Sequence, residues 1–203
     1  MPNYPAEAIV EEGRQVVVLR DAGHDAHAAI VPGVGNNLFR FIVQGRAVIQ
    51  PPGRLGDFGN PSAPFQYGIP ILYPPNRVKN GTLPFQGRTY RLPLNEPTNH
   101  LHGEISSKPW EVIDFGATED GGAYVTSRFR YEDHPEMLAY FPHALVFEVT
   151  YRLFEGALAM ESSIVNEGED EAPFAYGLHP YFPIYPEDGE EIALRMPAAR
   201  EWP

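Results

Sequence analysis

The chain has 203 residues, of which 43% are hydrophobic and 21% are charged, and it carries a formal net charge of −12. This composition is ordinary for a folded globular protein, and the negative charge disfavours binding to the phosphates of nucleic acids. Because the sequence contains no cysteine, disulfides, thiolate catalysis and cysteine-ligated metal centres are excluded. Neither a secretory signal nor an apolar run of about 18 residues is visible, so we expect a cytoplasmic protein that does not cross a membrane.

Short strands are predicted near the start of the chain, over residues 15–19 and 38–43. Between them His24 and His27 stand three positions apart, a spacing that can hold a metal ion, but the surrounding polar residues are more typical of a turn. No metal site is therefore predicted. Residues 50–64 are rich in proline, glycine, asparagine and aspartate, which predicts a long loop, either a wall of a binding cleft or a surface excursion.

The second half of the chain alternates with period 2. In residues 145–153 the odd positions are apolar and most even positions are polar, which is typical of a half-buried antiparallel strand. Glu155-Gly156 predicts a tight turn, because glycine readily adopts positive φ, and residues 157–165 form the returning strand.

The remaining elements are shorter. A second hairpin is predicted upstream over residues 110–115 and 124–131, further strands over 89–92 and 192–194, and a short helix over 135–140. No long stretch has the 3.6-residue period of a helix. The chain is therefore predicted to be all-β, with one domain over residues 1–203.

Two histidine motifs stand out, Leu101-His102-Gly103 and His179-Pro180-Tyr181-Phe182. Histidine has an unperturbed pKa of about 6.5, so it can donate or accept a proton near neutral pH. Taken alone, each histidine is more typical of a structural, hydrogen-bonded residue than of a catalyst.

Together with the segments around them, these motifs resemble the aldose 1-epimerase (galactose mutarotase) family. Asn76-Arg77-Val78 and Asn99-His100-Leu101-His102-Gly103 are similar to the family's Asn-Arg-Ile/Val segment and its Asn-x-Leu-His-Gly-Gly motif. Asn166-Glu167-Gly168, Pro173 and the second histidine motif are similar to its Asn-x-Gly, Pro and His-Pro-Tyr-Phe signature. The resemblance implies a large antiparallel β-sandwich that interconverts the α and β anomers of a hexose by acid–base ring opening, without a cofactor.

The resemblance also implies the site residues. His179 matches the histidine assigned as general acid toward the ring oxygen, and His102 matches the histidine that lines the sugar site. Arg77 matches the arginine that hydrogen-bonds sugar hydroxyls, and Asn76 beside it is a further candidate for substrate binding. The implied partner is a small aldose.

The chain departs from the family pattern in its C-terminal part and at one motif position. The family's general base is a glutamate that lies, with a sugar-binding aspartate, in a C-terminal part that no segment of this chain matches, so we expect a sandwich that is incomplete there. The second glycine of Leu-His-Gly-Gly is Glu104, interpreted as a solvated loop carboxylate rather than a substitute base. Besides an enzyme, a catalytically inactive carbohydrate-binding module and an inactive fragment stay open, as does completion by a homo-oligomer or another chain.

Overall fold

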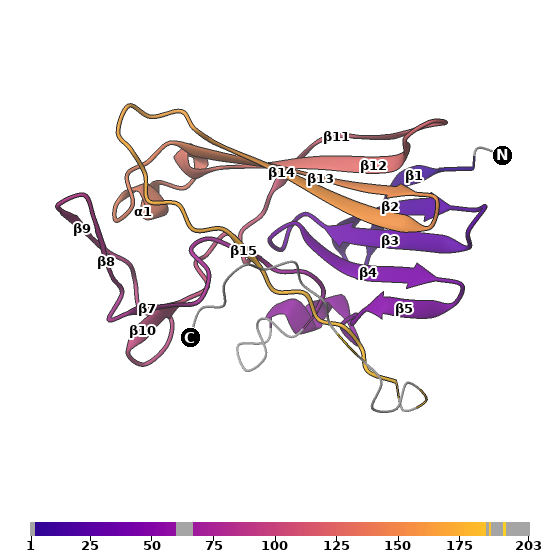
Figure 1. The fold of residues 1–203 in the computed structure, drawn as a ribbon, viewed down its shortest axis with the longest axis horizontal. Coiled ribbons are helices and arrows are strands. Elements are labelled where there is room, and N and C mark those ends of the chain that lie inside the picture. The colour runs from indigo at the N-terminus through magenta and orange to yellow at the C-terminus, as the bar shows by residue number, and fades with distance from the viewer. Residues whose placement is uncertain (1–2, 60–66, 186, 188–192, 194–203) are drawn as a thin grey trace.

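The computed structural model describes residues 3–59, 67–185, 187 and 193, and two antiparallel sheets dominate it (Figure 1). The first sheet has the strand order β1 (Ala6–Glu11), β2 (Arg14–Asp21), β3 (Ala26–Val31), β4 (Asn37–Val43) and β5 (Arg46–Ile49). The second has the order β11 (Glu111–Thr118), β12 (Gly122–Arg130), β13 (Leu145–Phe154) and β14 (Ala157–Asn166). The all-β prediction is confirmed.

The chain between the sheets forms smaller pairs of strands. β6 (Ile71–Leu72) pairs with β15 (Gly177–Leu178), β7 (Arg77–Lys79) with β10 (Asn99–Leu101), and β8 (Thr82–Phe85) with β9 (Arg88–Arg91). The helical elements are η1 (Leu55–Gly59), η2 (Tyr131–Asp133) and α1 (Pro135–Leu138). In the part of the chain that the structure describes, no helix is long and apolar enough to cross a membrane.

The β13–β14 hairpin follows the alternation of its sequence. The odd positions of β13, with Phe147 at the centre opposite Ile164, are buried. Glu155 and Gly156 have φ of +49° and +70° and return the chain into β14, as their turn chemistry requires. The other predicted hairpin, the early strands and the short helix are also confirmed within a few residues, whereas the strand predicted over 192–194 lies outside the described residues but for residue 193.

The core lies between the two sheets, where β1 and β2 contact β11, β12 and β13. Large aromatic side chains fill it, and Phe129, Phe147 and Tyr151 are at most 1% exposed. The buried Tyr151 hydroxyl donates to the Asn36 carbonyl over 3.1 Å and so connects β13 to the turn between β3 and β4. A buried hydroxyl needs such a partner, because an unpaired one costs about 1–3 kcal/mol.

The loop predicted over residues 50–64 contains a short helix in its described part. The η1 residue Leu55 is 2% exposed, and its backbone N–H donates to the Glu12 carboxylate over 2.8 Å. Residues 60–66 of the predicted loop lie outside the described residues. The described part of this segment is therefore packed against the first sheet rather than a surface excursion.

Candidate functional site

Short strand pairs bring the two histidine motifs together. β7 lies antiparallel to β10, so that Arg77 is opposite Leu101. β6 pairs with β15, and Tyr73, which follows β6, bridges to Gly103. Because the β6 segment contacts both motifs, the His102 and His179 rings lie side by side, with centroids 5.4 Å apart and planes at 74°.

Asn76 and His102 fix each other's geometry. Both residues have left-handed backbone conformations, with φ of +64° and +61°. The His102 N–H donates to the Asn76 carbonyl over 3.0 Å, and the Asn76 N–H donates to His102 Nδ1 over 3.1 Å. Since Nδ1 accepts this hydrogen bond, the proton of the neutral ring is on Nε2. In this structure Asn76 orients His102, and its binding of substrate stays a prediction.

Gly103, in the first histidine motif, lies where the neighbouring backbone leaves no room for a side chain. Gly103 has a φ of +66°, and a Cβ atom there would lie 1.9 Å from the Tyr73 carbonyl oxygen. No residue with a side chain fits that approach without moving the backbone. Gly103 therefore allows the close contact with Tyr73 that sets the position of the preceding His102.

Arg77 is held by a glutamate that the sequence did not indicate. Its Nε donates to Glu96 Oε2 and Oε1 over 2.9 and 3.2 Å, and its Nη2 donates to Oε1 over 2.9 Å. The hydrogen bond from Arg77 is the main cause that lowers the pKa of Glu96. Asn95 anchors the same turn, because its side chain both accepts from and donates to the Leu101 backbone over 2.6 and 2.8 Å. Glu96-Pro97 lies in a loop without a recognisable pattern, so the sequence does not predict the ion pair between Arg77 and Glu96.

The environment of the two histidines favours uncharged His102. Burial is the largest cause that lowers its pKa, followed by His179 and Arg77, while Glu96 opposes the shift. The backbone N–H of His179 donates to the Pro70 carbonyl over 3.0 Å, and its ring stacks on Tyr181 with the two centroids 4.9 Å apart. These contacts fix the position of His179. The buried Nδ1 of His179 has no hydrogen-bond partner among the described residues.

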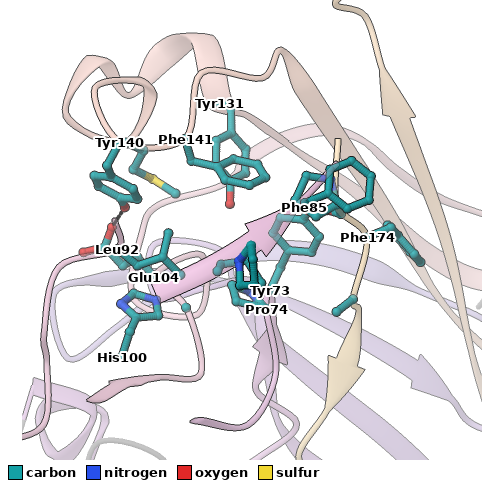
Figure 2. A pocket seen from close by; sticks show the side chains of 16 residues that line it. Tyr73, Pro74, Phe85, Leu92, His100, Glu104, Tyr131, Tyr140, Phe141 and Phe174 are labelled. Atoms are coloured by element: carbon teal, nitrogen blue, oxygen red, sulfur yellow. Dashed lines mark hydrogen bonds between the residues drawn. The ribbon is translucent and has the colours of Figure 1, made fainter. Parts of the chain in front are cut away.

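The four predicted site residues His102, His179, Arg77 and Asn76 thus gather on one open face, where Asn76 and Arg77 are exposed. They line neither of two neighbouring cavities. One cavity of about 450 Å³ lies on the Glu96 and Leu101 side, and an apolar one of about 200 Å³ lies on the His100 side (Figure 2).

Glu104 differs from the solvated loop carboxylate that was expected. It is half-buried, it lines both cavities, and it accepts a hydrogen bond from the Tyr140 hydroxyl. Of the two early histidines, His24 lies in the predicted turn, with its Nδ1 2.9 Å from the Asp21 carboxylate, whereas His27 lies on β3. Within the described ranges, no three His, Cys, Asp or Glu side chains are arranged to hold a metal ion.

Comparison with known proteins identifies the family. The Aldose 1-epimerase family model matches residues 17–202. The protein YihR of Escherichia coli K12 is 29% identical over 182 residues, which cover 87% of this chain and 54% of that protein. A galactose mutarotase-like protein from Clostridium acetobutylicum has a TM-score of 0.79 at 29% identity, covering 88% of this chain and 54% of that chain.

A structure of galactose 1-epimerase from Lactobacillus acidophilus has a TM-score of 0.57 at 16% identity, covering 74% of this chain and 45% of that chain, and so resembles it in fold alone. The chain spans about half the length of these relatives (54% for YihR). Since the family model extends over most of the sequence and the sandwich is galactose mutarotase-like, the chain belongs to the aldose 1-epimerase family.

Proposed function

We propose that this protein interconverts the α and β anomers of a hexose. The observation that supports this most directly is the pair of adjacent imidazoles, His102 and His179, with Arg77 beside them on one open face. Mutarotation needs an acid at the ring oxygen, a base at the anomeric hydroxyl and groups that hold the other hydroxyls. Imidazole and guanidinium suit the first and third of these tasks.

In this proposal each residue acts at a stated atom. His179 donates a proton from Nε2 to the ring oxygen as the bond between that oxygen and the anomeric carbon breaks, while a base removes the anomeric hydroxyl proton. The open-chain aldehyde rotates about its first C–C bond and closes on the other face, which returns both protons. Neutral His102 donates Nε2–H to a sugar oxygen, because its Nδ1 already accepts from Asn76. Arg77 binds hydroxyls with the donors that Glu96 does not occupy.

The general base is not assigned. Glu96 and Glu104 lie close to His102 in the chain, but Glu96 accepts hydrogen bonds from Arg77 and Glu104 accepts one from Tyr140. A carboxylate stabilised by Arg77, with a lowered pKa, is a weak base. This engagement of both carboxylates favours a second candidate function, a sugar-binding module without catalysis.

Exchange NMR of glucose and galactose anomers distinguishes the two functions. We expect the folded protein to accelerate exchange, and His179→Ala to remove the contribution of general acid catalysis, typically ~10²–10⁴-fold. Arg77→Ala should raise the sugar concentration needed for half-maximal acceleration of exchange. His24→Ala, in the turn after β2, is the matched histidine control and should leave the acceleration unchanged. No acceleration by a folded sample would refute the enzyme, and sugar-induced shifts that depend on Arg77 would then support the binding module.

A further inference from the structure

The apolar cavity on the His100 side of β10 is distinct from the open histidine face. It has a volume of about 200 Å³ and is walled by side chains of the β8–β9 hairpin, the η2–α1 segment and the chain before β15, among them Leu83, Phe85, Met137, Phe141 and Phe174 (Figure 2). His100 closes one side; it is 2% exposed and is fixed by donating from Nδ1 to the Pro93 carbonyl over 2.6 Å. The site is therefore a formed cavity between several elements, the kind of place where small molecules bind.

Two polar groups in this apolar lining have unused hydrogen-bonding capacity. Tyr131 is 3% exposed, and Figure 2 shows its hydroxyl pointing into the cavity. Figure 2 draws no hydrogen bond between this hydroxyl and another residue that lines the cavity. Glu104 uses Oε2 to accept from Tyr140, and this is the hydrogen bond that Figure 2 draws at Glu104 among the lining residues. A ligand hydroxyl that enters the cavity can pair with this group, which an apolar ligand leaves unpaired.

Tyr131 and Glu104 both line this cavity. The pKa of Tyr131 is raised well above its ordinary value, first by burial and then by Tyr73, Tyr140 and Glu104. The Tyr131 hydroxyl therefore stays neutral and can both donate and accept a hydrogen bond in the cavity. A ligand hydroxyl can pair with the Tyr131 hydroxyl, whereas an apolar ligand of the same size cannot.

We propose that this cavity is a binding site for a small, mainly apolar alcohol or phenol, whose hydroxyl pairs with Tyr131. A cavity of 150 Å³ holds benzene, so about 200 Å³ suits a ligand of roughly six to ten non-hydrogen atoms. A sugar is the wrong chemistry here, because most of its hydroxyls would face leucine, proline and phenylalanine side chains unpaired. An anion is disfavoured by Glu104. This inference does not rest on the proposed anomer interconversion.

Calorimetric titration with phenol, toluene and benzoate tests the site. We expect phenol to bind with a Kd of about 1 mM or tighter, toluene about tenfold more weakly because it lacks the hydroxyl, and benzoate more weakly still. Tyr131→Phe should weaken phenol binding about tenfold and leave toluene binding unchanged. Glu104→Gln should weaken the discrimination against benzoate. Tyr124→Phe is the matched control, since that hydroxyl donates to Asp114 on the β11–β12 surface.

The methyl signals of the methionines show where phenol binds. With methyl-labelled methionine, phenol should shift the signal of Met137, which lines the cavity, and not that of Met160, which lies on β14. The proposal is overturned if phenol does not bind to the folded protein, if the Met137 signal does not move, or if Tyr131→Phe and Tyr124→Phe bind phenol equally well. Retained toluene binding shows that a variant has folded.

Discussion

At the scale of single residues, the site depends on backbone conformations that few side chains tolerate. Asn76, His102 and Gly103 all have positive φ, and two of them exchange hydrogen bonds. Asparagine and glycine adopt this conformation at low cost, whereas a histidine there is held by its surroundings. The segment around His102 is therefore constrained before any ligand binds.

Gly103→Ala should cost much more stability than Gly13→Ala. Both glycines have positive φ, +66° and +77°, so both variants suffer the backbone penalty of about 1 kcal/mol. Only at Gly103 does the new Cβ meet a backbone atom, the Tyr73 carbonyl oxygen, whereas nothing lies within 4 Å of it at Gly13. We expect an additional loss of about 2 kcal/mol in unfolding free energy by urea denaturation. Equal losses for the two variants would contradict the close approach.

The lowered pKa of His102 predicts the sign of a pH dependence. The folded state binds this proton less tightly than the unfolded state, whose histidine pKa is about 6.5. Between the two pKa values the unfolded chain holds more protons, so the contribution of His102 to stability is lost as pH falls below about 6.5. The His102 imidazole signal should titrate below 6.5 by NMR, and His102→Asn should flatten the rise of unfolding free energy between pH 5 and 8. A titration midpoint of His102 above 6.5 would contradict the predicted lowering of its pKa.

At the scale of elements, one buried carboxylate joins the two sheets. Asp21 is 1% exposed at the end of β2, and it accepts from the backbone N–H groups of Gly23 and His24 in its own turn. Its Oδ2 also accepts from the N–H of Gly156 over 2.8 Å, in the β13–β14 turn of the other sheet. Turns that are far apart in the chain are thus tied at the same end of the sandwich.

Asp21→Ala should lower the free energy of unfolding by about 3 kcal/mol, because it leaves several backbone N–H groups without an acceptor. Glu7→Ala is the control, since its ion pair with Arg20 has side chains 50% and 48% exposed and should contribute less than about 1 kcal/mol. Asp21→Asn keeps one acceptor oxygen and should lie between them. Thermal and urea unfolding measure all three, and a loss for Asp21→Ala as small as for Glu7→Ala would show that the tie is weak.

At the scale of the whole molecule, the segment after β14 exposes large apolar side chains. Phe174, Leu178, Phe182 and Ile184 are 64%, 43%, 55% and 75% exposed. Figure 1 shows this segment, orange to yellow, running from β14 past β15 toward the far end of the first sheet. Exposed large apolar side chains along one segment favour association between molecules.

The double substitution Phe182→Ser/Ile184→Ser should therefore reduce self-association without lowering stability by more than about 0.5 kcal/mol. Sedimentation velocity over a range of concentrations measures the first quantity and urea unfolding the second. Val10→Ser, at a 76% exposed position on β1, is the matched control and should leave association unchanged. A wild-type protein that stays monomeric at all concentrations would contradict the expectation.

The sequence by itself determined the long hairpins and the identity of the motifs. Alternation over residues 145–153 and the Glu155-Gly156 turn are local signals, because strand faces repeat every second residue and turns need particular φ values. The strands β6, β7, β10 and β15 have only two or three residues, too few to show a period, and β3 is rich in alanine, so these were not predicted.

Only the tertiary structure decided how the site is assembled. His102 and His179 are 77 positions apart, and their contact depends on the pairing of β6 with β15 and on the bridge from Tyr73 to Gly103. The partners Glu96 for Arg77 and Tyr140 for Glu104, and the cavity that Tyr131 faces, likewise come from segments that meet in space. Local patterns report which face of an element is buried, whereas side-chain pairing across the fold follows from packing, which single-sequence patterns do not encode.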